Sequence, residues 1–231
     1  QVNPQYMFEF GDLTVRASGE IHSMSPTTLQ TVGGTTLTFE GRFAHVESLR
    51  CFFAGYSLPV PAVKVNDFTV QCVAPPRPTG ICHVYLAGSD DQQIPVLFPT
   101  TSSLLELRYE EPVKVLEVNP KIIADNMGIP LTISVSTITN HPDLQCIFDF
   151  RARTRTETIG PTVQVVKTKA RWMNSKELTC YAPSLLSVGS SENVDYDWSR
   201  VYVSPNGQDR SVNYVDLHVL PPIQWYEAIS V

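Results

Sequence analysis

Four short segments of the first half of the chain recur in the same order in the second half, and this internal repeat constrains the fold more than any other feature. The pairs are residues 36–41 with 130–135 (PLTISV), RCFF at 50–53 with QCIF at 145–148, QCVAP at 71–75 with TCYAP at 179–183, and HVYLA at 83–87 with RVYVS at 200–204. Four matches in one order predict that the chain contains the same small domain twice. The extra length of the second copy falls between Phe148 and Cys180 and at residues 184–198.

The segment that joins the repeats has the sequence EPVKVLEVNPKIIADNMGIPL at residues 111–131. It predicts a strand, a turn at Asn119-Pro120 and the start of a further strand. Its opening pattern returns as PIQWYEAISV at the end of the chain. We therefore expect four parts: residues 1–18 as an arm or the last strand of a preceding domain, 19–112 as domain 1, 113–221 as domain 2, and 222–231 as the first strand of a following domain or a tail.

Short alternating runs of β-branched and aromatic residues, separated by turns, predict an all-β fold. Residues 35–40 show the pattern, because Thr35, Leu37 and Phe39 alternate with more polar positions after the glycine turn at Gly33-Gly34. The chain contains 18 prolines and 12 glycines, as expected for frequent turns. No apolar run is long enough to predict a membrane helix. The net charge of -6 argues against nucleic acid as a partner.

The turn and strand residues of the first repeat resemble those of IPT/TIG domains, the immunoglobulin-like modules found in plexins, transcription factors and many surface proteins. The resemblance depends on Pro26, Gly33-Gly34-Thr35, Gly41-x-Phe43, Cys51-x-Phe53, Cys72-x-x-Pro75 and Val84-x-Leu86. In the second repeat, Gly128-Ile129-Pro130 replaces the glycine pair. The resemblance covers roughly residues 19–220. It implies two tandem early-set immunoglobulin-like β-sandwiches, a fold that hosts many functions.

Four of the five cysteines occupy matching places in the two repeats. We therefore expect the disulfides Cys51–Cys72 and Cys146–Cys180, which would indicate an extracellular protein. The alternative is that all five are buried thiols of a cytosolic protein. Cys82 remains, and it is either an inward-facing core thiol or the site of an intermolecular bridge.

No catalytic motif is present in the sequence, and neither a cofactor nor a metal is expected. Arg151, Arg153 and Arg155 have a spacing of two, so on a strand they share one face. Such a stripe would bind an acidic glycan or an acidic neighbouring subunit, although a solvated face is the simpler interpretation. Trp172, Trp198 and Trp225 belong equally well to an interface or to ordinary packing.

These observations predict a non-enzymatic structural or adhesive segment of a larger extracellular or cell-surface repeat protein. It would assemble into a rod, filament or surface appendage through domain faces and edge strands. Its expected partners are other protein subunits, copies of itself or glycans. Two alternatives stay open: the stalk of a plexin-like receptor ectodomain, and an intracellular transcription-factor dimerisation module.

Overall fold

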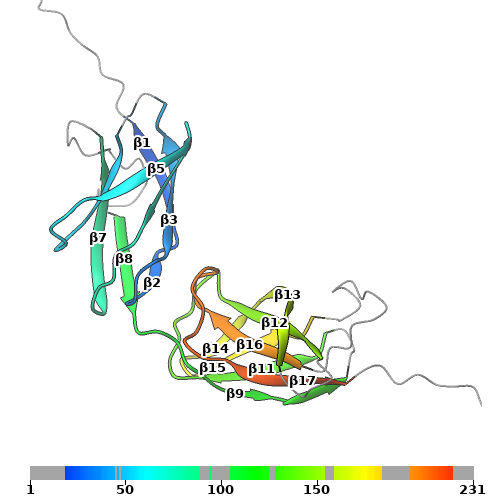
Figure 1. Ribbon diagram of the computed structural model, residues 1–231. Coiled ribbons are helices and arrows are strands. Elements are labelled where there is room, and N and C mark those ends of the chain that lie inside the picture. Colours follow the sequence, from blue (N-terminus) through cyan, green and yellow to red (C-terminus); the bar gives the residue numbers. More distant parts are fainter. Residues whose placement is uncertain are drawn as a thin grey trace, which may run out of the picture. The chain divides into compact units, whose positions relative to one another are not determined.

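The computed structural model describes residues 19–44, 46, 48–88, 94, 105–124, 128–153, 159–183 and 198–220; within these ranges it gives only the backbone of 152, 153 and 159–163. The expected arm at 1–18 and the expected strand or tail at 222–231 lie outside these residues. The described chain is all-β, which confirms the expected fold class, and its strands form two sandwiches. Figure 1 shows the strands in each.

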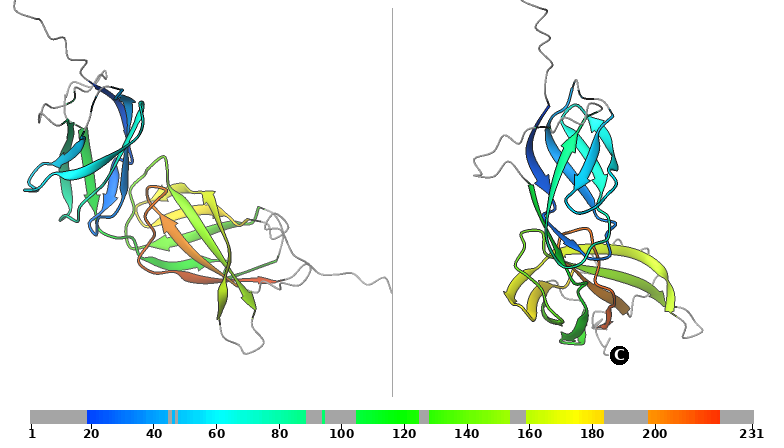
Figure 2. Two further views of the ribbon diagram at one scale, coloured as in Figure 1. Left: turned by 45° about the horizontal axis from the view of Figure 1, so that its top comes forward. Right: turned by 90° about the vertical axis from the view of Figure 1, so that its left-hand side faces the viewer.

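Eight strands form the N-terminal sandwich. They are β1 (Glu20–Ser25), β2 (Thr28–Gln30), β3 (Thr36–Arg42), β4 (Arg50–Phe53), β5 (Val60–Asn66), β6 (Thr69–Val73), β7 (Gly80–Ala87) and β8 (Leu105–Glu110). They follow one another in the order β1-β3-β6-β5-β4-β7-β8-β2. Strand β5 pairs with both β6 and β4, so it links the two layers of the sandwich (Figure 2).

The alternation expected at residues 35–40 explains the core of this sandwich. Thr35, Leu37 and Phe39 are buried, whereas the positions between them are partly or fully exposed. On β4, β6, β7 and β8, too, alternate side chains are buried in this core. These residues include Cys51, Phe53, Val70, Cys72, Val84, Leu86 and Leu107.

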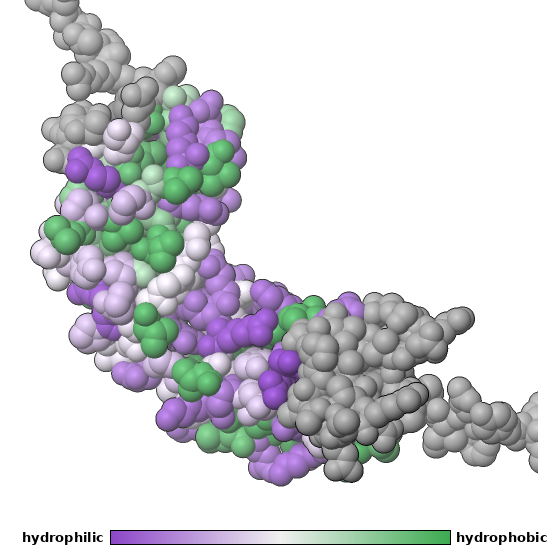
Figure 3. All heavy atoms as spheres, viewed as in Figure 1, coloured by the Kyte–Doolittle hydropathy of each residue, from purple (hydrophilic) through white to green (hydrophobic). Residues whose placement is uncertain are grey.

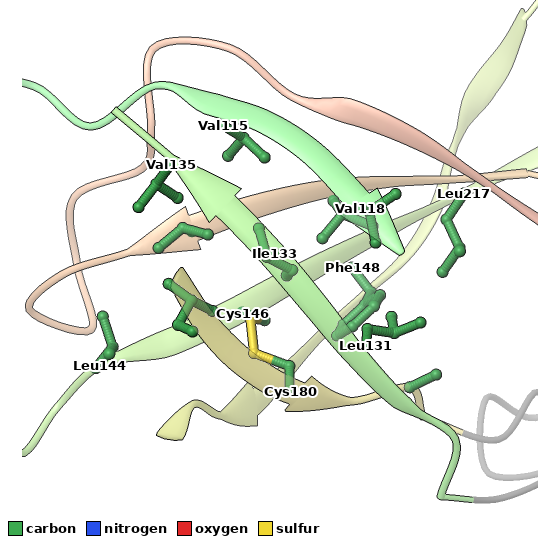
Figure 4. Packing of buried hydrophobic residues seen from close by; sticks show 14 of the residues in the cluster. Val115, Val118, Leu131, Ile133, Val135, Leu144, Cys146, Phe148, Cys180 and Leu217 are labelled. Atoms are coloured by element: carbon green, nitrogen blue, oxygen red, sulfur yellow. A yellow bond between two sulfur atoms is a disulfide. The ribbon is translucent and has the colours of Figure 1, made fainter. Parts of the chain in front are cut away.

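Nine strands form the C-terminal sandwich. They are β9 (Val115–Asn119), β10 (Ile122–Ala124), β11 (Pro130–Val135), β12 (Gln145–Arg153), β13 (Ile159–Lys169), β14 (Arg171–Asn174), β15 (Glu177–Tyr181), β16 (Trp198–Ser204) and β17 (Val215–Leu220). One sheet has the order β10-β17-β16-β12-β13 and the other β14-β15-β11-β9. Their inner faces enclose one cluster that includes Leu131, Ile133, Phe148, Val201 and Leu217 (Figure 4).

The two sandwiches share one topology, strand for strand. In each, the first strand is split between the two layers, as β1 and β2 or as β9 and β10. The corresponding central pairs are β4–β7 and β12–β16. The single crossing strand β5 has β13 and β14 as its counterpart. Gly128, at the place of the glycine pair, also has a positive φ, of +80°. The repeat found in the sequence is therefore a repeat of the whole strand order.

Tyr109 on β8 connects two parts of the N-terminal sandwich. Its side chain is buried, and its hydroxyl donates a hydrogen bond of 3.1 Å to the carbonyl oxygen of Pro75, directly after β6. Burial, followed by the electrostatic effect of Cys82, raises the pKa of this hydroxyl, and Arg77 opposes the shift. Tyr109 therefore stays neutral where an exposed tyrosine would ionise.

Replacing Tyr109 with phenylalanine is expected to lower the free energy of unfolding by about 1–2 kcal/mol, because the carbonyl of Pro75 loses its buried donor. Denaturant unfolding of both proteins measures this. In the wild type, stability is expected to fall as pH rises above about 10, because the unfolded chain gives up this proton more readily. That alkaline loss should be smaller in Tyr109→Phe; an identical loss in both proteins would assign it to other groups.

Candidate interaction surfaces

Four cysteines form two disulfides, and each bond connects the two layers of one sandwich. Cys51 of β4 is bonded to Cys72 of β6, with their Cα atoms 6.5 Å apart. Cys146 of β12 is bonded to Cys180 of β15, with a Cα separation of 6.3 Å (Figure 4). Both pairs lie in the cores. Their role is structural, because they fix the two sheets to each other.

Cys82 on β7 is 2% exposed and accepts a hydrogen bond from the guanidinium of Arg77 at 3.0 Å. It therefore occupies the inward position that its parity with Val84 and Leu86 predicts. An intermolecular bridge from Cys82 stays a prediction, and it would require this thiol to leave the core.

The arginine stripe lies on and beyond β12. Arg151 bonds Asp149 of the same strand, with its Nη2 2.7 Å from Oδ2 of the carboxylate. The backbone of Arg153 pairs with Ile159 of β13, and the strand register shifts on both sides of Arg151. Arg155 lies outside the described residues. That the three arginines share one face stays a prediction. In the structure, Arg151 forms an ion pair with Asp149.

The outward side chains of β12, β16 and β17 form a surface that is called here the outer face. On β12, Phe148 and Phe150 point into the core. The alternating residues Asp149 and Arg151 therefore point away from it. Register places Arg151 opposite Trp198 and Asp149 opposite Arg200, and Trp198 is in turn opposite His218. Further members of the outer face are Tyr202 of β16, Asp216 of β17 and Tyr214, which directly precedes β17 and contacts Tyr202.

Aromatic and cationic groups alternate along this face. The rings of Trp198 and His218 have centroids 3.6 Å apart. The guanidinium of Arg200 lies 4.2 Å from the centroid of Tyr214, which contacts Tyr202 at 5.5 Å. Trp198 is nonetheless 43% exposed and Tyr214 37%. These contacts orient large exposed rings, which is typical of binding surfaces.

The sequence singled out Trp198 but missed its neighbours on the outer face. Trp198, Arg200 and Tyr202 are spaced by two on a strand, a signal that the sequence contains. The outer face also includes Asp149, His218 and Tyr214. Their place on it depends on how β12, β16 and β17 are aligned, and the sequence alone does not reveal this register.

A second candidate surface lies on the β5–β6 hairpin of the N-terminal sandwich. Val63 and Val65 are 66% and 54% exposed, and Phe68 at the turn is 66% exposed. These three residues are called here the apolar hairpin. Tyr56 and Leu58, in the loop before β5, are also exposed. Figure 3 shows that several hydrophobic areas reach the visible surface of this sandwich.

Within the described residues, no group of three or more histidine, cysteine or acidic side chains is placed to hold a metal ion. The described part of the chain also contains no helix of the length and hydropathy needed to cross a membrane.

Comparison with known proteins identifies the fold. The model of the IPT/TIG domain matches residues 20–101. The extracellular region of plexin A4 is similar with a TM-score of 0.50 and 13% identity, over 87% of this chain and 16% of that one. The adhesin InvE of Yersinia pseudotuberculosis has a TM-score of 0.29 and 11% identity, over 87% of this chain and 58% of that one. No curated protein matches the sequence. The chain thus spans about a sixth of the plexin chain, and the likeness at this identity concerns the fold.

Proposed function

Since residues 20–101 belong to the IPT/TIG family and the same strand order follows in the C-terminal sandwich, we propose that this chain is a non-enzymatic structural or adhesive segment of a larger extracellular protein. Neighbouring copies associate through sandwich faces and edge strands to build a rod, a filament or a surface appendage. The wider class, a non-enzymatic extracellular immunoglobulin-like segment, agrees with the similar folds.

The observation that carries this proposal is the exposure of the apolar hairpin. Val63 and Val65 lie on one face of β5, and Phe68 adds an aromatic ring at the tip of the same hairpin. Exposed apolar side chains are ordinary when scattered, but a group on one element marks a surface that a partner covers. Covering these three residues would remove them from water at a gain of roughly 1.5–3 kcal/mol for each fully buried side chain.

The rigidity of the hairpin supports the same conclusion. The backbone nitrogen of Phe68 donates to Asn66 Oδ1 at 2.7 Å, and the Lys64 ammonium bonds Asp67 at 2.8 Å. Phe68 is therefore presented on a turn that its neighbours already fix. A partner that binds it loses little conformational entropy in the hairpin.

Strand β13 supports pairing through an edge. Among the described strands it pairs with β12 alone, and it is eleven residues long. Its other edge therefore presents backbone donors and acceptors that a strand of another molecule can bind. Lys167 and Lys169 near its end limit such pairing to a partner strand that tolerates or complements positive charge.

The disulfides support the extracellular location. Two bonds that fix the layers of both sandwiches persist only where the compartment is oxidising.

Replacing Phe68 with serine tests the proposal. We expect the wild type to show a mass that rises with concentration in sedimentation equilibrium, and the variant to associate at least about 10-fold more weakly, because its largest exposed apolar contact is lost. Tyr181→Ser is the matched control, since Tyr181 is an exposed aromatic residue on β15 of the C-terminal sandwich. A wild type that stays monomeric, both as this chain and in the complete protein, would contradict self-association.

A further inference from the structure

Among the buried polar atoms of the outer face without a hydrogen-bond partner in the described part of the chain, two lie on residues that are directly opposite each other. One is Oδ1 of Asp149, whose residue is only 3% exposed and whose other oxygen is bonded to Arg151. The second is Nε of Arg200, directly opposite Asp149 on β16. Buried polar groups in folded proteins are nearly always satisfied by protein or by water, so this pair marks a place on the outer face where a polar group of a ligand can bind.

The chemistry of the two atoms restricts what that group is. The carboxylate oxygen of Asp149 only accepts hydrogen bonds, and the Nε–H of Arg200 only donates them. A phosphate, sulfate or carboxylate would supply acceptors alone and would be repelled by Asp149. An ammonium group would supply donors alone and would be repelled by Arg200. A hydroxyl group donates and accepts, as a water molecule does, so water satisfies both atoms in the free protein and neighbouring hydroxyls of a sugar can replace it.

Trp198 supplies the second element of a saccharide site. Trp198 lies two residues before Arg200 on β16, so both side chains are on the same face, and it is paired with Arg151 of β12. Trp198 is 43% exposed. The contact with His218 orients the ring. An exposed, oriented indole offers an apolar surface to the C–H face of a pyranose, while the polar atoms of the next row face its hydroxyls.

We propose that the outer face is a binding site for a neutral hexose-containing glycan. One sugar ring stacks on Trp198, one hydroxyl donates to Asp149 Oδ1, and a hydroxyl oxygen accepts from Arg200 Nε. Both atoms are buried in the unliganded face, so binding includes a rotation of a side chain above them. Arg151, which contacts Asp149 directly and has a 20% exposed side chain, is placed for that rotation. The site is separate from the apolar hairpin, which lies on the other sandwich.

Isothermal titration with four neutral probes (cellohexaose, laminarihexaose, maltohexaose and mannohexaose) tests the site, with heparin as the acidic comparison. We expect at least one neutral probe to bind with a dissociation constant below about 1 mM, and Trp198→Ala to weaken that binding at least about 10-fold. Asp149→Ala should weaken it similarly. Tyr181→Ala, which removes an exposed aromatic residue from the opposite sheet, should bind as the wild type does.

Thermal unfolding of each variant separates lost binding from lost folding. Because Trp198 is already 43% exposed, Trp198→Ala should remain folded. This variant therefore tests the glycan site even where Asp149→Ala does not fold. The proposal is overturned when no neutral probe binds with a dissociation constant below about 1 mM. It is equally overturned when Trp198→Ala binds like the wild type, or when heparin alone binds.

Discussion

Replacing both Cys146 and Cys180 with alanine is expected to lower the free energy of unfolding of the C-terminal sandwich by about 2–5 kcal/mol. The bond joins β12 of one sheet to β15 of the other across 34 residues of chain, so its loss frees a long loop in the unfolded state. Both cysteines are fully buried in the cluster with Leu131, Ile133 and Phe148, so their removal also leaves a void. A loss of this size approaches the whole stability of a small domain.

Denaturant unfolding under non-reducing conditions, which keep the Cys51–Cys72 bond intact, measures the effect. Cys82→Ala is the matched control, since it removes a buried cysteine without breaking a disulfide. The control should lose much less stability than the double variant. If the double variant unfolds at the wild-type midpoint, the bond between the sheets contributes no stability.

The sequence predicted the cores of both sandwiches because their signal is local. Inward positions recur every second residue, and the segments of the repeat correspond to paired positions in the strand orders: β3 with β11, β4 with β12, β6 with β15, and β7 with β16. One of the two expected places of the extra length was also predicted correctly, whereas residues 184–197 of the other lie outside the described residues. The insertion between Phe148 and Cys180 is the extension of β12 together with the long strand β13 and its continuation β14.

The outer face was not predictable in the same way, because it depends on register between strands that are distant in sequence. Asp149 follows a run of apolar residues, and nothing local distinguishes it from a solvated surface carboxylate. Its burial results from the pairing of β12 with β13 and β16, which places Val165 on one side of it and Arg200 on the other. Two register shifts near Arg151 also alter the regular spacing from which the arginine stripe was inferred.

Gly41 on β3 is a position where strand propensity and structure predict opposite effects. Glycine inside a strand is normally less stable than alanine by roughly 0.5–1 kcal/mol, so propensity alone predicts that Gly41→Ala stabilises the protein. Gly41 is paired with Ile21 of β1, next to a register shift between Ile21 and Ser23. That irregularity brings the backbone of Glu20 so close that a Cβ on residue 41 would collide with its carbonyl oxygen and carbon.

Gly41→Ala is therefore expected to lower the free energy of unfolding of the N-terminal sandwich by more than about 2 kcal/mol. The neighbouring group is backbone rather than a flexible side chain, so relief requires β1 to move away from β3, which disrupts their pairing. Denaturant unfolding measures the loss, and Glu40→Ala on the adjacent exposed position should change stability by no more than about 0.5 kcal/mol. A Gly41→Ala protein as stable as the wild type, or more stable, would show that β1 pairs with β3 without this close approach, and strand propensity would then decide the effect.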